Sequence, residues 1–343
     1  MRIAIIYSIP TKRARSTIYA LTDEDTTQSA KTIARALSKL HHSSFVVPVS
    51  EHTIDAIRHI RADLIFNLIE WTGLDLPLAV QAMDVLATLK IPYTGVSKEQ
   101  YVNTTDKGIM KHLFHEYGIP TPVWQIFNSD SEPLRKIFHY PVILKPTTEH
   151  ASIGVTSDSI ARNARDMREK LSAMYYQFRQ PILVEEFISG NEYHVPILES
   201  SGTIEILPPT KIVFDPKIRY PLLTFFGRWI PGHKDFSKTY LSDHDLDHDL
   251  LQRVSHMCVK AFSLFRLRDY ARMDLRIRKR QLYVLEINSN PGLDDDPEYE
   301  FMRSCTSGNV SFPKLIESII TSATWRNGGL FESKISVNTW DLS

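Results

Sequence analysis

Residues 270–288 read YARMDLRIRKRQLYVLEIN, and this stretch of the 343-residue chain carries most of the information about the fold. Two runs of alternating apolar and polar residues flank a polar segment, which is the pattern of a β-hairpin. Successive side chains of a strand point to opposite faces of a sheet. One face of this hairpin is therefore predicted to be apolar and to lie on a core: Met273, Leu275, Ile277, Tyr283, Leu285 and Ile287.

The opposite face of the hairpin carries charged side chains. A turn centred on Arg280 places Asp274 opposite Glu286. The same turn places Arg272 opposite Asn288. Two carboxylates directly across a hairpin repel each other, so a cation is expected between them. Oxygen ligands suit Mg²⁺ rather than zinc, and such ions commonly neutralise polyphosphate.

The alternative is a solvent-exposed strand side with mixed charges. An NSNPG turn follows the hairpin at residues 288–292 and places these side chains at a strand end. Active-site residues tend to lie at such positions, so the turn favours a functional site.

Composition excludes several classes of protein. With 43% hydrophobic and 23% charged residues the chain is an ordinary globular protein, and its zero net charge favours neither a nucleic acid nor a membrane as partner. No apolar run is long enough to cross a bilayer, and the first one is too short for a signal peptide. The cysteines, Cys258 and Cys305, stand in no metal or redox motif and are predicted to be reduced thiols. We therefore expect a cytoplasmic protein.

The first hundred residues alternate between strand-like and helix-like segments, which predicts a doubly wound parallel α/β sheet. The predicted strands are 2–7, 45–49, 63–69 and a short one at 91–95. The predicted helices are 28–39, 54–60 and 77–89, and residues 9–25 are predicted to be a loop.

From about residue 103 the pattern becomes α+β. Helices are predicted at 106–117, 159–178, 245–265 and 312–322, and strands at 123–127, 140–145, 153–156, 181–187, 192–198, 203–206 and 211–214. The last ten residues are expected to be loosely held. Together these patterns predict three domains: an N-terminal domain at 1–102, a central lid at 103–189 and a C-terminal catalytic domain at 190–343.

Two further segments favour a nucleotide. Lys145 ends an apolar strand and is followed by the small polar loop 147–154, TTEHASIG, a combination that suits phosphate but also fits a solvent-exposed strand edge. Residues 182–192, ILVEEFISGNE, run from an apolar strand into a turn. Backbone groups around residues 186–188 could bind an adenine edge and Glu192 could accept hydrogen bonds from a ribose. An ordinary strand–turn–strand with exposed carboxylates is the alternative.

Five short motifs, taken in order, resemble those of ATP-grasp enzymes and most of all those of the D-alanine–D-alanine ligase group. They are DKGIMK from Asp106, VILKP around Lys145, EEFISGNE from Glu185, ARMD from Ala271 and EINSNPG from Glu286. Each motif is weak alone, but the ordered set is specific, and the resemblance extends from about Asp63 to Ile320. It implies an ATP-grasp fold, with an N-terminal doubly wound parallel-sheet domain, a central α+β lid and a C-terminal α+β domain.

The resemblance also implies site residues. ATP would be held by Lys107 and Lys145 at its phosphates, Glu185, Glu186, Phe187 and Ile188 at adenine, and Glu192 at the ribose. Two Mg²⁺ ions, with Mn²⁺ as a substitute, would be held by Asp274, Glu286 and Asn288. The catalytic residues would be Ser152 over the transferred phosphate, Arg219 and Tyr220 near the reacting groups, and Arg272 at the oxyanion of the tetrahedral intermediate.

The implied reaction is carboxylate–amine ligation. ATP would phosphorylate a small carboxylic acid, and an amine would then attack the acyl phosphate to form an amide. The resemblance suggests a homodimer. Two alternatives stay open: phosphorylation without amide formation, and ATP binding without catalysis. The second is motivated by His150 and Ala151, which replace a glycine and a serine of the family's phosphate loop; retention of Arg272 argues against it.

The substrate half departs from the family pattern. The family's N-terminal Gly-rich segment is not recognisable in residues 8–28, and Glu70-Trp-Thr-Gly stands in place of the family's His-Gly. A substrate other than D-alanine is therefore expected. The acidic run Asp294–Asp296, with Glu298, hints at a cationic or amine-rich second substrate, although an acidic loop is usually only solvated.

Overall fold

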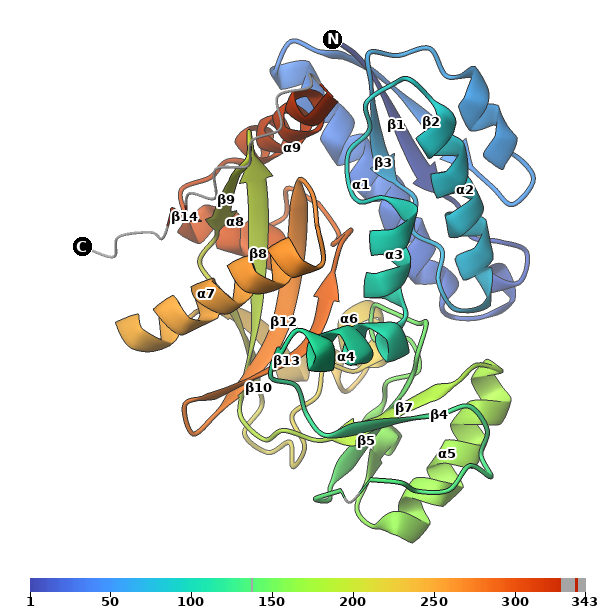
Figure 1. Cartoon of the computed structure of the whole chain (residues 1–343), viewed down its shortest axis with the longest axis vertical. Helices are drawn as coiled ribbons and strands as arrows, with labels where there is room; N and C mark the ends of the chain where they lie inside the picture. The colour runs from blue at the N-terminus through green and yellow to red at the C-terminus, as the bar shows by residue number, and fades with distance from the viewer. Residues whose placement is uncertain (137, 328–336, 339–343) are drawn as a thin grey trace.

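The structure is a computed structural model that describes residues 1–136, 138–327 and 337–338. Within these residues the chain forms one parallel sheet, one antiparallel sheet and one mostly antiparallel sheet, in agreement with the predicted α/β class (Figure 1). The expectation of a loosely held end falls on residues 334–343, which lie outside the described residues apart from 337–338.

The N-terminal sheet is parallel, with the strand order β2-β1-β3. Its strands are β1 (Arg2–Ser8), β2 (Ser43–Val49) and β3 (Leu64–Leu68), and the short strand predicted at 91–95 is a single parallel bridge between Tyr93 and Ile65. Ile3 and Ile5 pack on the side of α1 (Ala20–Lys39), and Ala4 and Ile6 on the side of α2 (Leu76–Thr88). Helices therefore cover both faces, as the doubly wound pattern predicts.

Helix α1 corrects the prediction that residues 9–25 are a loop, because it begins at Ala20 and not near Gln28. Its first turns bury polar side chains, among them Thr22, Asp23 and Thr26. The Thr26 hydroxyl donates to the carbonyl of Ser8 at 2.8 Å. A buried face made of polar residues has no apolar periodicity, so the sequence pattern placed the start too late. The helix predicted at 54–60 is a 3-10 helix, Ile54–His59.

The central sheet is antiparallel, with the order β4-β7-β5-β6, and α5 (Ala164–Phe178) packs on it. Its strands are β4 (Trp124–Phe127), β5 (Val142–Pro146), β6 (Ile160–Ala161) and β7 (Ile182–Glu186). The strand predicted at 153–156 is wrong. Ser152 and Gly154 have φ values of 61° and 76°, so the chain turns there instead of extending, and β6 forms later.

The C-terminal sheet has the order β11-β10-β8-β12-β13, with β9 beside β8 and β14 beside β9. Its strands are β8 (Asn191–Ser200), β9 (Thr203–Ile206), β10 (Thr210–Phe214), β11 (Thr239–Asp243), β12 (Tyr270–Arg278), β13 (Gln281–Asn288) and β14 (Val337–Asn338). Helix α7 (His248–Leu264) lies across one face, where Val254 and Cys258 share a core with Val195 and Met273 (Figure 1). The other helices are α3 (Lys98–Thr105), α4 (Lys107–Glu116), α6 (Phe225–Trp229), α8 (Glu300–Ser307) and α9 (Phe312–Asn327).

The hairpin β12–β13 has the predicted pairing at its charged end. Asp274 lies opposite Glu286, and Arg272 lies opposite Asn288. Strand β12 also pairs with β8, so Arg272 and Asp274 lie within the sheet, whereas Glu286 and Asn288 lie on β13, its edge strand.

Nearer the turn, the predicted register is wrong. Leu275 pairs with Val284, so Leu285 is an extra residue of a β-bulge. The turn is formed by residues 279–280, both with positive φ, as a two-residue hairpin requires. Consequently Val284, and not Tyr283 or Leu285, lies in the core beside Leu275.

Among the described residues, no helix is long and apolar enough to cross a membrane. We propose that the domain boundaries lie near residues 102–103 and 189–190, between the three sheets.

Candidate active site

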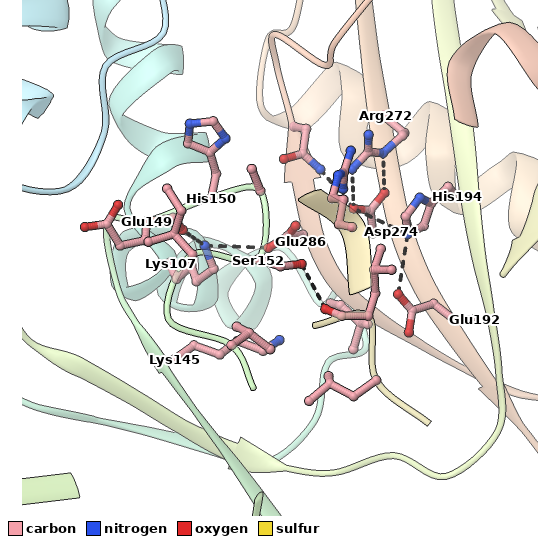
Figure 2. A pocket seen from close by; sticks show the side chains of 18 of the residues that line it. Lys107, Lys145, Glu149, His150, Ser152, Glu192, His194, Arg272, Asp274 and Glu286 are labelled. Carbon is pink, nitrogen blue, oxygen red and sulfur yellow. Dashed lines mark hydrogen bonds and ion pairs between the residues drawn. The ribbon is translucent and has the colours of Figure 1, made fainter. Parts of the chain in front are cut away.

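One pocket is lined by residues of the central and C-terminal sheets and by residues that lie next to the N-terminal sheet (Figure 2). Lys145 reaches it from β5, and Asp274 and Glu286 reach it from the hairpin. Glu70 follows β3, and Asp25 comes from α1. All but two of the predicted site residues line this pocket: Lys107, Lys145, Ser152, Glu185, Glu186, Phe187, Ile188, Glu192, Arg272, Asp274, Glu286 and Asn288.

A buried carboxylate joins two lysines at one end of the pocket. Lys145 Nζ lies 2.8 Å from Glu185 Oε1, and Lys111 Nζ lies 2.8 Å from Glu185 Oε2. Burial alone would raise the pKa of Glu185, but the two ammonium groups outweigh it and lower that pKa to about 2. Glu185 therefore carries a full negative charge, and Lys145 is held at the pocket wall.

Lys107 is the first residue of α4, whose N-terminus is capped by Asp106. Its amide donates to the carbonyl of Thr147 at 2.8 Å, and its ammonium group donates to the carbonyl of Glu149. The same ammonium group lies 3.6 Å from Glu286 Oε2 (Figure 2). Burial would raise the pKa of Glu286, but nearby cations, led by Lys107, lower it to about 2.

The Arg272 guanidinium donates to both oxygens of Asp274, at 2.7 and 2.8 Å (Figure 2). The Asn288 amide donates to Asp274 Oδ2 at 3.0 Å. Arg276 in turn binds the Glu192 carboxylate, with its closer nitrogen at 2.6 Å from Oε2. The charged side chains of β12 are thus buried, and those of β13, Glu286 and Asn288, are partly buried and paired within the protein. This excludes the alternative of a solvent-exposed mixed-charge strand.

Sequence reasoning missed His194, which lies opposite Asp274 on β8. Its Nε2 lies 3.4 Å from Glu192 and 3.8 Å from Asp274, and its Nδ1 lies 3.6 Å from Glu300. Burial would lower the pKa of His194, but the surrounding carboxylates raise it to about 9, so the ring is cationic at neutral pH. The available signal was its place two residues after Glu192, on the same strand face.

The predicted metal ligands fit a hard cation. Asp274, Glu286 and Asn288 supply carboxylate and amide oxygens at adjoining positions of one hairpin, as Mg²⁺ requires. In the described part of the chain, no group of three or more His, Cys, Asp and Glu side chains is arranged as a metal cluster. The predicted set has only two carboxylates, so an ion there would need further oxygens from a nucleotide or water.

The predicted phosphate loop is tied to the segment that follows β10. Ser152 Oγ donates to the carbonyl of Leu223 at 2.9 Å, and Trp229 Nε1 donates to the carbonyl of Ala151 at 2.9 Å. A Cβ on Gly154 would come within 3.0 Å of Phe178 and Pro146. The loop can therefore run between these two side chains only with a glycine at this position.

Arg219 and Tyr220 are the two predicted catalytic residues that do not line the pocket. Tyr220 packs edge-on against Phe187 at 5.7 Å, and Arg219 stacks on Tyr220 at 5.3 Å. Arg228 and Trp229 of α6 line the pocket instead, and Arg228 lies 3.3 Å from Glu300. No sequence pattern indicated that Arg228 and Trp229 would line the pocket, because α6 has only five residues.

The other end of the pocket is acidic. Burial and the neighbouring carboxylates raise the pKa of Glu70 to about 8, and burial also raises the pKa of Asp25. His150 lies 3.6 Å from Glu70, but burial and Lys107 lower its pKa to about 3, so it is neutral and supplies no cation to this end of the pocket. The predicted acidic run does not line the pocket, since Asp294 accepts a hydrogen bond from Thr32.

Comparison with known proteins identifies the family. The family model described as D-ala D-ala ligase C-terminus matches residues 113–321. The chain belongs to the D-alanine–D-alanine ligase family. An uncharacterised protein, y4sG of Sinorhizobium fredii, is 32% identical over 240 residues, which are 70% of this chain and 68% of that protein. The D-alanine–D-alanine ligase of Aquifex aeolicus is 26% identical over 299 residues, which are 86% of this chain and 94% of that enzyme.

A solved structure shares the fold. The crystal structure of the D-alanine–D-alanine ligase from Bacillus anthracis complexed with ATP aligns with a TM-score of 0.71 at 19% identity, over 96% of this chain and 99% of that one. The predicted ATP-grasp fold and the predicted family are both confirmed. As a D-alanine–D-alanine ligase family member, the chain is an ATP-dependent ligase that forms carbon–nitrogen bonds.

Proposed function

We propose that this pocket joins a small carboxylic acid to an amine through an acyl phosphate, with ATP and two Mg²⁺ ions bound. The γ-phosphoryl group of ATP passes to a carboxylate oxygen of the acid, leaving ADP. The amine nitrogen then attacks the acyl carbon, phosphate leaves with the former carboxylate oxygen, and the amine proton passes to solvent or phosphate. The observation that carries the proposal is that one pocket holds two lysines at one end and the paired charges of the hairpin beside them.

The lysine end supports a nucleotide. Lys107 and Lys145 come from different elements and face the same space, so both can neutralise phosphate oxygens. Phe187 and Ile188 add apolar lining against which a base could pack. Glu192 lies at the end of this wall, where a ribose would come within its reach.

The hairpin supports the chemistry between the substrates. Asp274, Glu286 and Asn288 would hold the Mg²⁺ ions, whose charge offsets that of the phosphates. Arg272 is fixed by two hydrogen bonds to Asp274, so its guanidinium needs no reorganisation to stabilise an oxyanion. Ser152 would cover the transferred phosphoryl group from the loop above.

The acidic end supports an amine-bearing substrate. Glu70 and Asp25 lie at this end without a charged lysine or arginine bonded to either carboxylate in the described structure. A substrate ammonium group would supply the missing positive charge. The family match names D-alanine for the relatives, but Glu70 and the acidic lining favour a different amino-acid-like substrate here.

The test is release of phosphate and ADP from Mg²⁺-ATP in the presence of acid and amine pools. Ligation predicts release that needs both an acid and an amine, and a product mass equal to their sum less one water. Release with an acid alone would favour phosphorylation without amide formation. ATP binding with no release from any pool, together with equal behaviour of Arg272→Ala, would favour binding without catalysis.

A further inference from the structure

Lys111 is a buried charge that the proposed chemistry does not use. It lies on α4 one helical turn after Lys107, and its side chain is 1% exposed. It does not line the pocket. A buried ammonium group is costly unless it is paired and hydrogen-bonded, so this lysine needs an explanation.

The Lys111 ammonium group has three partners within the protein. Nζ forms an ion pair with Glu185 Oε2 at 2.8 Å. It also donates hydrogen bonds to Thr121 Oγ1 at 2.6 Å and to the carbonyl of Leu285 at 3.0 Å. Lys111 therefore differs from Lys145, which shares Glu185 with it but lines the pocket.

The three acceptors belong to different parts of the site. Glu185 is 1% exposed and is also bonded to Lys145, and Leu285 is the bulge residue directly before Glu286. Thr121 links Lys111 to the hairpin, because its hydroxyl donates a hydrogen bond to the carbonyl of Val284 at 2.8 Å. One side chain thus ties the lysine end of the pocket to the hairpin.

We propose that Lys111 is a positioning residue of the ligase: it fixes the Glu185 carboxylate, and through it the Lys145 ammonium group, for nucleotide binding. The inference rests on the proposed function. Without Lys111, Glu185 would have one cation instead of two, and Lys145 would be drawn further toward it and away from phosphate. The bulge carbonyl would also lose its donor beside Glu286.

The test compares ADP binding, by calorimetry, in the wild type, Lys111→Met and the surface control Lys98→Met. Lys98 pairs with Asp84 on the surface and has no contact with the pocket. We expect Lys111→Met to weaken ADP binding at least about tenfold and to raise the KM for ATP more than it lowers kcat, with the control unchanged. ADP affinity of Lys111→Met within about twofold of wild type would overturn the inference. A wild type that binds no ADP would instead overturn the proposed function.

A double-mutant cycle separates positioning from general stability. If Lys111 acts through Glu185, Lys111→Met has little further effect on ADP affinity in a Glu185→Gln background. If the losses of ADP affinity in the two single variants add up in the double variant, Lys111 does not act through Glu185. If Lys111→Met does not fold, Thr121→Val takes its place, because it removes one acceptor and keeps the ion pair. We then expect a threefold or so rise in the KM for ATP, and an unchanged KM would refute the proposal.

Discussion

The two ends of the pocket differ in how their charges are balanced. At the lysine end, Glu185 and Glu286 lie beside ammonium groups, and their pKa values are lowered to about 2 despite burial. At the acidic end, burial and neighbouring carboxylates raise the pKa of Glu70 to about 8. The first end is balanced by charges of the protein itself, whereas among the described residues no lysine or arginine is bonded to Glu70 or Asp25 at the second. We infer that the protein organises the proposed nucleotide half by itself and that a cationic substrate completes the other half.

The largest effect is expected at the hairpin. Asp274→Asn and Glu286→Gln each keep the shape of the side chain and remove a charge that would hold Mg²⁺. Losing one such ligand should cost several kcal/mol of transition-state stabilisation, or about 1,000-fold in turnover. The loss of turnover is measured as the steady-state rate of ADP release over a range of Mg²⁺ concentrations. Full activity in either variant at ordinary Mg²⁺ would remove these residues from the metal site.

Arg272→Ala should reduce kcat about 100- to 1,000-fold, because an oriented donor to the oxyanion would be lost. The KM for ATP should change little, since Arg272 is placed at the reacting groups and not at the nucleotide. Arg276→Lys on the same strand face is the comparison, because it retains a cation beside Glu192. An Arg272 variant defective only in ATP binding would assign it to the lysine end instead.

At the acidic end, Glu70→Gln should raise the KM for the amine substrate about tenfold, the effect of losing one partly buried charge pair. The KM for ATP should stay constant, which is the opposite of the pattern expected for Lys111→Met. Glu70→Asp keeps the charge and should recover part of the affinity. If Glu70→Gln changed only the KM for ATP, the two ends of the pocket would not bind different substrates.

The same variant has a signature in stability. Below the ordinary pKa of 4.5, Glu70 is neutral in both the folded and the unfolded chain. As the pH rises from 4.5 to 8, the unfolded chain loses this proton and the folded chain keeps it, so stability falls. Glu70→Gln removes this loss of stability. Its melting temperature should exceed that of the wild type by about 2–4 °C or more at pH 8.5. At pH 4.5 the two melting temperatures should hardly differ. An equal difference at both pH values would contradict the raised pKa.

The smallest effect is expected where the N-terminal segment meets the central and C-terminal parts. Tyr19 packs on Phe225 at 4.9 Å and on Phe178 at 6.0 Å, next to the loop that carries Ser152. Aromatic contacts of this kind contribute about 0.5–1.5 kcal/mol each, so Tyr19→Leu should raise the KM for ATP about two- to fivefold. Tyr19→Phe keeps the ring and should match the wild type. A loss in Tyr19→Phe equal to that in Tyr19→Leu would point to the hydroxyl instead.

The sequence was sufficient to place part of the lysine end, because Lys145 and Glu185 stand at the ends of apolar strands. Lys145 and Glu185 follow runs whose hydrophobicity predicts β5 and β7, and the assumption of a turn centred on Arg280 placed Asp274 opposite Glu286. Contacts between residues far apart in the sequence were harder to predict. His194 reaches Asp274 only through the pairing of β8 with β12, which no local pattern determines.

The acidic end escaped prediction for a different physical reason. Its helix, α1, buries Thr22 and Asp23 where an amphipathic helix would bury apolar residues, so its start has no periodic signal. The short α6, which supplies Arg228, is fixed by contacts with the phosphate loop and not by its own propensity.

The bulge at Leu285 makes two successive residues of one strand line the pocket, an apolar one and then Glu286. A regular strand offers only alternate residues to a given side. Deleting Leu285 would restore a regular hairpin in which Glu286 still lies opposite Asp274, but it would also remove the carbonyl that accepts a hydrogen bond from the buried Lys111 ammonium group. The irregularity therefore does two things at once: it brings a second residue of the strand to the pocket, and it satisfies a buried charge behind the pocket wall.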